Sequence, residues 1–221
     1  MIHDRAKRHP ILWKLVEEIG EANGERWQNQ VGDFIREVKP NVTVETGVYL
    51  GTSSDRILRA LDTNNQGVLW SIDPVYQFDP APEVHPMDIY HHRWRQFRGL
   101  SVQGMPYVYR QTGPWDVFIH DSDHSALCQT YEYTLAWELL KPGGYLLSDD
   151  LTWSEHRSWD RFLKTKNMNY KKLGHCGVVR KPMSEPAPNI GRDELDTFVI
   201  GCMTLANEAA KLAGEPERYV L

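Results

Sequence analysis

The sequence has little cysteine, no excess of positive charge and no long apolar run. Its three cysteines are scattered, odd in number and without the paired spacing of metal ligands, so no disulfide framework is expected. The formal net charge of −5 argues against nucleic acid or an anionic membrane surface as the main partner. No run approaches the length of a membrane span, and the charged N-terminus is unlike a signal peptide. These absences predict a cytoplasmic protein.

The remaining composition is that of a globular domain. Hydrophobic residues make up 41% of the 221 residues and charged residues 25%, which fits one sizeable α/β domain. We expect an N-terminal helical cap at residues 1–40 and a ligand-binding domain at 41–221. Apolar residues at helical spacing predict two helices in the cap. The first carries Leu12, Leu15, Val16 and Ile19, and the second carries Val31, Phe34, Ile35 and Val38 and stops at Pro40.

Beyond residue 40, short β-rich runs alternate with helical patterns. This alternation predicts a Rossmann-like, doubly wound α/β sheet of seven strands in a single domain. Helices are expected after Thr52 or Ser53, at 90–97, along 127–139 and at 159–163. The last two strands are joined by the Pro-rich stretch 181–195 without a helix, so they are expected to be antiparallel and the sheet mixed. The strands are predicted at 42–46, 68–73, 107–109, 116–121, 145–149, 176–180 and 197–201.

Acidic residues follow several of the predicted strands. Ligands of open α/β sheets bind beyond the carboxyl ends of the strands, near the switch point of the topology. Carboxylates gathered in a dry place are costly unless they are paired or coordinated. The set therefore predicts a cation, a hydroxylated ligand or both, although any one acid fits a helix cap or a solvated position equally well. Its members are Glu45, Asp73, Asp121, Asp149 and Asp150.

The loop after the first strand contains Gly47 and Gly51. Their spacing differs from the dinucleotide fingerprint G-x-G-x-x-G, but glycines let the backbone approach a ligand, and N–H groups at a helix start bind anions. Asp73 lies 26 residues beyond Gly47, which is roughly the distance at which an acid binds ribose hydroxyls. Loop and acid together predict an adenosine-containing cofactor, and leave S-adenosylmethionine and NAD both open.

Four segments of the sequence resemble the class I S-adenosylmethionine-dependent methyltransferases, and they occur in that family's order. They are VTVETGVYLGTSS, VLWSIDP, WDVFIHDSDHS and LLKPGGYLLSDD, and the resemblance spans residues 42 to about 202. The Asp-x-Asp-His block, the Lys-Pro-Gly-Gly run and the Asp-Asp pair are similar to small metal-dependent O-methyltransferases of macrolide and aminocoumarin sugars, and to cephalosporin hydroxylase-like proteins. The resemblance implies S-adenosylmethionine as cofactor, a small hydroxylated acceptor (a sugar, phenol or catechol) and a homodimer.

The resemblance also implies roles for individual residues. Ser101 would lie near the adenine, and Asp73 would hold the ribose. His124 matches the general base of some members, whereas others place an acid at Asp123. The cofactor set is completed by Glu45, Thr46, Gly47, Gly51, Ser53 and Asp121, of which Glu45 and the backbone around the glycines would bind the methionine portion. The metal set is Asp121, Asp149 and Asp150.

The chemistry of these residue types fits the implied reaction. Three carboxylates provide the oxygen-rich coordination that suits Mg²⁺. A bound cation lowers the pKa of an acceptor hydroxyl, and a histidine is suited to take the released proton at neutral pH.

The sequence departs from the family where the acceptor should bind. Ser122 replaces the common glycine between the two aspartates, and loops 74–92 and 152–157 match no known pattern. An S-adenosylmethionine-binding accessory or hydroxylase-like protein without methyl transfer therefore stays open. A nucleotide-dependent oxidoreductase is disfavoured by the missing fingerprint, and nucleic-acid methylation by the missing Asn/Asp-Pro-Pro-Tyr motif and by the charge.

Overall fold

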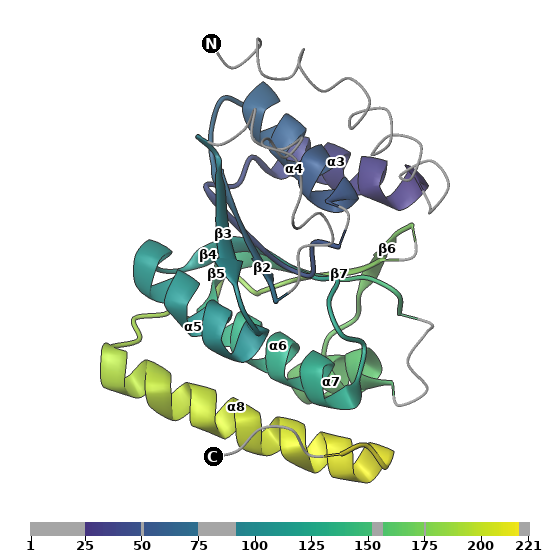
Figure 1. The fold of residues 1–221 in the computed structure, drawn as a ribbon, viewed down its shortest axis with the longest axis vertical. Helices are drawn as coiled ribbons and strands as arrows, with labels where there is room; N and C mark the ends of the chain where they lie inside the picture. The colour runs from purple at the N-terminus through teal and green to yellow at the C-terminus, as the bar shows by residue number, and fades with distance from the viewer. Residues whose placement is uncertain (1–24, 50, 75–91, 152–156, 175, 217–221) are drawn as a thin grey trace.

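A mixed sheet of seven strands forms the centre of the molecule (Figure 1). The computed structural model describes residues 25–49, 51–74, 92–151, 157–174 and 176–216. The strand order is β3-β2-β1-β4-β5-β7-β6, in which β7 is antiparallel to β5 and β6 and the other pairs are parallel. The strands are β1 (Val42–Thr46), β2 (Val68–Asp73), β3 (Trp94–Arg98), β4 (Trp115–His120), β5 (Leu140–Ser148), β6 (Lys171–Leu173) and β7 (Cys176–Arg180). This sheet confirms the predicted Rossmann-like, doubly wound architecture, and its switch point lies between β1 and β4.

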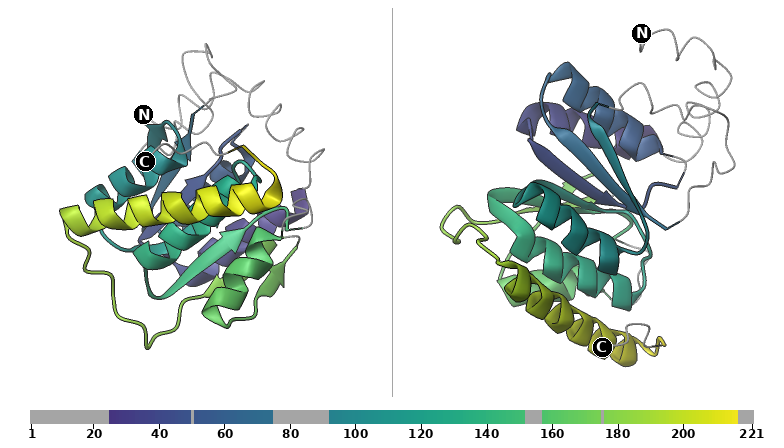
Figure 2. Two further views of the ribbon diagram at one scale, coloured as in Figure 1. Left: turned by 90° about the horizontal axis from the view of Figure 1, so that it is seen from below. Right: turned by 60° about the vertical axis from the view of Figure 1, so that its left-hand side comes forward.

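Helices cover both faces of the sheet (Figures 1 and 2). Helices α3 (Glu25–Val38) and α4 (Thr52–Thr63) cover one face. Helices α5 (Ser101–Thr112), α6 (Ala126–Leu139) and α7 (Ser158–Lys166) cover the other, and α8 (Arg192–Ala213) packs against α6 and α5 from outside. Helix α6 is therefore buried on most sides. None of the helices in the described ranges is long and apolar enough to cross a membrane.

Three of the predicted elements were wrong. Residues 90–97 were expected to be helical, but β3 begins at Trp94, whose buried indole N–H donates to Ser71 Oγ at 2.8 Å. Residues 107–109 and 197–201 were expected to be strands, but they lie inside α5 and α8. Their aromatic and β-branched residues favour strands locally, but burial of one helix face overrides this propensity. The strand count is unchanged because β3 and β6 replace the two misassigned strands.

Some expectations lie outside the described residues. These are the first predicted helix, with Leu12 to Ile19, nearly all of the loop 74–92, and most of the loop 152–157. The second predicted helix is confirmed as α3, which ends at Val38 before Pro40.

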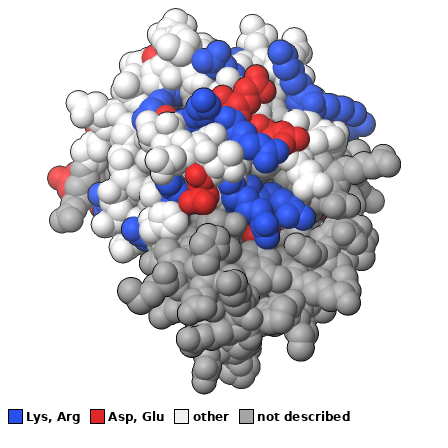
Figure 3. All heavy atoms as spheres, turned by 90° about the horizontal axis from the view of Figure 1, so that it is seen from above, with Lys and Arg blue, Asp and Glu red and all other residues white. Residues whose placement is uncertain are grey.

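Charges of both signs are interspersed on the face above α3 and α4 (Figure 3). Ion pairs join them: Arg59 Nε lies 2.8 Å from Asp55 Oδ2, and Arg93 Nε lies 3.3 Å from Asp62 Oδ1. The described part of this face therefore carries no field of a single sign.

Candidate active site

The residues that follow β1, β4 and β5 are tied side by side at the switch point. Gly47 N donates to Ile72 O at 3.0 Å, Asp121 N donates to Thr46 O at 2.9 Å, and Asp149 N donates to His120 O at 2.9 Å. These bonds continue the parallel ladders one residue past the strand ends. The acids predicted from separate segments of the chain therefore meet at one edge of the sheet.

The turn after β1 requires glycine at residue 47. Gly47 has φ +84°, and a Cβ there would lie 1.9 Å from Asp121 O. Gly51, with φ 77°, is the N-cap of α4, so neither Thr52 nor Ser53 caps this helix as the sequence had suggested. Asp73 Oδ2 accepts hydrogen bonds from the backbone N–H groups of Val48 at 2.6 Å and Tyr49 at 3.2 Å. The acid expected at the ribose thus also holds the glycine turn in place.

Glu45 is fully buried beneath this turn, on the side of α4. Its Oε1 accepts hydrogen bonds from Ser71 Oγ at 2.6 Å and from Ser54 Oγ. Its Oε2 is buried without a hydrogen-bond partner among the described residues. Burial raises the pKa of Glu45 to about 7, although the bonds from Ser54 and Ser71 oppose the shift. A buried acceptor of this kind fits a cationic group of a ligand.

Two carboxyl groups crowd each other at the ends of β4 and β5. Burial raises the pKa of Asp121 well above its usual range, and the charge of Asp149 and a hydrogen bond with it raise that pKa further. Cys176 Sγ donates to Asp149 Oδ1 from β7 at 3.4 Å. Asp150, the third predicted metal ligand, adopts a left-handed conformation with φ 48°. The cluster concentrates negative charge that a cation would compensate.

The carboxylate pair fits Mg²⁺ in the chemistry of its donors. Within the described ranges, no three His, Cys, Asp or Glu side chains converge as a metal cluster. Mg²⁺ does not require such a cluster, because proteins hold it through one or two carboxylates while it keeps several waters. The oxygens of Asp121 and Asp149 are donors of this type.

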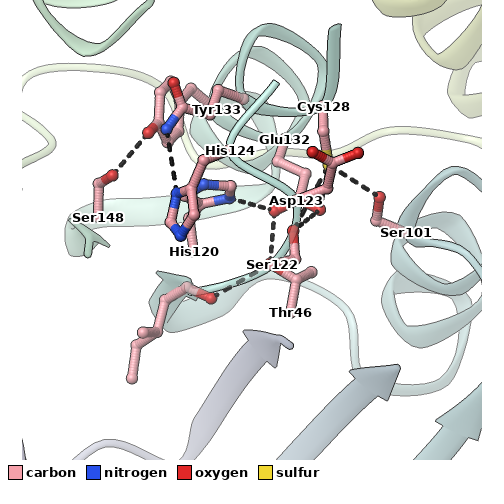
Figure 4. Close-up of polar contacts among 12 residues, drawn as sticks. Thr46, Ser101, His120, Ser122, Asp123, His124, Cys128, Glu132, Tyr133 and Ser148 are labelled. Carbon is pink, nitrogen blue, oxygen red and sulfur yellow. Dashed lines mark hydrogen bonds and ion pairs between the residues drawn. The ribbon is translucent and has the colours of Figure 1, made fainter. Parts of the chain in front are cut away.

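His124 is partly buried and lies beside His120 (Figure 4). Its Nε2 is 3.7 Å from Asp150 Oδ2, and its ring packs edge-on against His120 with centroids 5.3 Å apart. Burial lowers the pKa of His124, and His120 lowers it further against the opposing charge of Asp149. The ring is therefore neutral at pH 7 and is able to accept a proton.

Asp123 and Ser101 contact residues other than the carboxylate pair of Asp121 and Asp149. Asp123 is exposed, and its Oδ1 accepts from Ser125 N at 2.9 Å, at the start of α6. Ser101 begins α5, and its Oγ is 4.0 Å from Cys128 Sγ. Ser53 slightly opposes the rise in the pKa of Glu45, and Thr46 Oγ1 donates to Glu132 at 2.5 Å.

Glu132, which was not predicted from the sequence as a site residue, accepts hydrogen bonds at the centre of this region. Burial alone would raise the pKa of Glu132, but the charge of His120 and bonds from three side chains outweigh burial and lower it. A glutamate on the buried helix α6 needs hydrogen-bond partners in the core. The signal in the sequence was an acidic residue within a largely apolar helical segment.

Comparisons with known proteins agree with this geometry. Residues 44–151 match the family model described as a methyltransferase domain. The O-methyltransferase TomG from Streptomyces achromogenes, solved with S-adenosylmethionine, is 18% identical with a TM-score of 0.54, over 70% of this chain and 79% of that chain. The O-methyltransferase from Bacillus cereus is 14% identical with a TM-score of 0.58, over 77% and 90%.

A further similar structure is the MycE methyltransferase of mycinamycin biosynthesis, solved with Mg, S-adenosylhomocysteine and mycinamycin VI. It is 14% identical with a TM-score of 0.53, over 70% of this chain and 49% of that chain, so the alignment spans about half of MycE. No protein of curated function matches the sequence. The family model thus matches nearly half of the chain to a methyltransferase domain, and these solved methyltransferases share the fold of the chain.

Proposed function

We propose that the protein is an O-methyltransferase that transfers a methyl group from S-adenosylmethionine to a hydroxyl group of a small molecule, with Mg²⁺ assisting. The observation that carries this proposal is the close pair of carboxyl groups, Asp121 and Asp149, beside His124 and next to the Gly47 turn. The O-methyltransferases of similar fold support the type of acceptor atom.

The glycine turn and the acids around it suit the cofactor. The backbone around Gly47 and Gly51 would approach the methionine portion, because neither residue has a side chain. The buried Oε2 of Glu45 would accept from the cofactor's ammonium group. Asp73 would bind the ribose through the oxygen that does not hold the turn. When bound, S-adenosylmethionine supplies the electrophilic methyl group.

The acceptor side would depend on the carboxylates and the histidine. Asp121 and Asp149, with Asp150 as a third ligand, would hold Mg²⁺, which supplies charge that lowers the pKa of an acceptor hydroxyl. A sugar diol or a catechol offers two oxygens to such an ion. His124 would take the hydroxyl proton. We favour it over Asp123 because Asp123 is exposed and bonded to the backbone of Ser125.

Calorimetry tests both ligands without knowledge of the acceptor. S-adenosylmethionine is titrated into metal-free protein, and Mg²⁺ is titrated into wild type, Asp149→Asn and Asp116→Asn. We expect saturable cofactor binding, and Mg²⁺ binding that Asp149→Asn loses and Asp116→Asn keeps, because Asp116 lies at the opposite end of β4. Absence of cofactor binding would contradict the proposal, and Mg²⁺ binding that survives in Asp149→Asn would remove the metal role.

Turnover distinguishes the enzyme from a binding protein. Methyl transfer from radiolabelled S-adenosylmethionine is measured over a panel of sugars, phenols and catechols. Transfer to a hydroxyl supports the proposal. Cofactor binding with no transfer across the panel supports the accessory protein instead. The homodimer and the cytoplasmic location stay predictions.

A further inference from the structure

Glu132 of α6 is a buried carboxylate that the proposed reaction leaves without a role. Its Oε2 accepts hydrogen bonds from Thr46 Oγ1 at 2.5 Å and His120 Nδ1 at 2.6 Å. Its Oε1 accepts from Ser122 Oγ at 2.8 Å and Cys128 Sγ at 3.2 Å (Figure 4). An ionised carboxylate has about four lone-pair positions, so the acceptor capacity of this group is filled.

Three of the four donors lie in or beside the two turns of the candidate active site, and the fourth, Cys128, lies on α6 itself. Thr46 ends β1 and immediately precedes the Gly47 turn (residues 47–49). His120 ends β4 directly before the Asp121 turn (residues 121–125), and Ser122 lies in that turn. One carboxylate on α6 therefore joins two turns that lie far apart in the sequence. The backbones of the same turns touch through Asp121 N and Thr46 O, at 2.9 Å.

We propose that Glu132 is a positioning residue that sets the spacing of the Gly47 turn and the Asp121 turn, and thereby the affinity for S-adenosylmethionine. The inference rests on the proposed function, because it assumes that the cofactor occupies these turns. Loss of the carboxylate would leave its four donors buried without an acceptor, and they would move to find other partners. A cofactor that contacts both turns would then meet a displaced site.

The affinity for S-adenosylmethionine, measured by calorimetry below the unfolding temperature of every variant, tests this role. Glutamine at 132 replaces one oxygen by an NH₂ group, so two of the four donors face another donor. We expect Glu132→Gln to weaken binding about tenfold or more, and Glu132→Asp, which keeps the charge, to recover part of the loss.

Lys181→Met is the matched control for lost stability. Lys181 is also a buried charge against α6, and its Nζ donates to Trp137 O at 2.8 Å and Leu140 O at 3.0 Å. Its ammonium group bonds at the C-terminal end of α6, whereas Glu132 lies in the middle of that helix, and these bonds go to residues outside both turns. We expect this variant to unfold at a lower temperature and to bind S-adenosylmethionine as wild type does. A loss of affinity equal to that of Glu132→Gln would overturn the positioning role.

A double-mutant cycle keeps the inference testable if Glu132→Gln does not fold. Thr46→Val removes the link to the Gly47 turn, and Ser122→Ala removes the link to the Asp121 turn. If both links act through one carboxylate, the loss of affinity in the double variant is smaller than the product of the single losses. Multiplicative losses, or wild-type affinity in Glu132→Gln, would overturn the inference. Failure of wild type to bind the cofactor would overturn the proposed function itself, before any variant is compared.

Discussion

Strand β4 carries an aspartate at each end, and the two have opposite surroundings. Asp116 accepts from Asn41 N at 2.9 Å and Val42 N at 2.8 Å, and its other oxygen lies 2.8 Å from Lys141 Nζ. Asp121, directly after the strand, faces the like charges of Asp149, Glu45 and Asp150. The first carboxylate is compensated by an ammonium group and two backbone N–H groups, whereas the described neighbours that act most strongly on the second are acids.

If the proposed function holds, this difference separates a group that stabilises the fold from a group that serves a ligand. Asp116 fastens the start of β1 and the start of β5 to β4, so its charge is used within the protein. Burial raises the pKa of Asp121, and the charge of Asp149 and a hydrogen bond with it raise that pKa further, so an ionised Asp121 costs free energy in the unliganded protein. Sites that cost stability in the absence of ligand are typical of function rather than of folding.

The largest effect is expected from Asp121→Asn. If Asp121 holds Mg²⁺, methyl transfer falls at least about 100-fold, as when a group that stabilises developing charge is removed. The free energy of unfolding of the metal-free protein should rise, because asparagine is neutral in the folded and unfolded states and avoids the cost of burying an acid beside Asp149. Initial rates and thermal melts measure the two changes. Wild-type turnover together with a lower melting temperature would show that Asp121, like Asp116, stabilises the fold and does not serve the reaction.

Gly47→Ala tests whether the close approach of the two turns is required. A Cβ would overlap Asp121 O, and the residue would be held at φ +84°, so we expect a loss of about 3 kcal/mol or more in the free energy of unfolding. Gly201→Ala is the control. Gly201 lies in α8 with open space around it, so alanine there should add roughly 0.5–1 kcal/mol. Chemical denaturation measures the change in the free energy of unfolding of both variants. Changes of the same sign would contradict the requirement for glycine at residue 47.

Glu45 makes the stability of the unliganded protein depend on pH. Its pKa in the folded state is about 7, above the ordinary value of 4.5, so between these pH values the folded protein keeps a proton that the unfolded chain has lost. The free energy of unfolding should therefore fall as the pH rises from about 4.5 to about 7, by about 3 kcal/mol for this group. Denaturation at several pH values measures the slope, and Glu45→Gln should flatten it. An unchanged slope in that variant would assign the dependence to other groups.

The sheet was predictable where periodicity and burial agree. Strands β1, β2, β4, β5 and β7 and helices α3, α4, α6 and α7 lie where the sequence placed them. The misassigned segments 107–109 and 197–201 carry residues that favour strands. They are helical because α5 and α8 pack against α6, which outweighs the local propensity. That information is tertiary, so a local pattern does not contain it.

The site was predictable to the level of the acids at the strand ends. The ladder bonds bring Gly47, Asp121 and Asp149 together, as expected when parallel strands end at one edge. The contacts that decide orientation were not predictable. Asp73 accepts from the backbone of the Gly47 turn, and Glu132 bonds to side chains at two turns. The partners of both acids depend on side-chain geometry in the folded core.

Asp116→Asn gives the smallest effect and sharpens the comparison most directly. The amide keeps the shape of the carboxyl but lacks the charge that attracts Lys141, and its NH₂ group faces either that amine or the N–H groups of Asn41 and Val42. Because these groups are only partly buried, we expect a loss of about 1–2 kcal/mol in the free energy of unfolding. The affinities for S-adenosylmethionine and Mg²⁺ should stay as in wild type, since β4 separates Asp116 from the candidate site. A fall in either affinity at a temperature where the variant is folded would show that both ends of β4 serve the ligand.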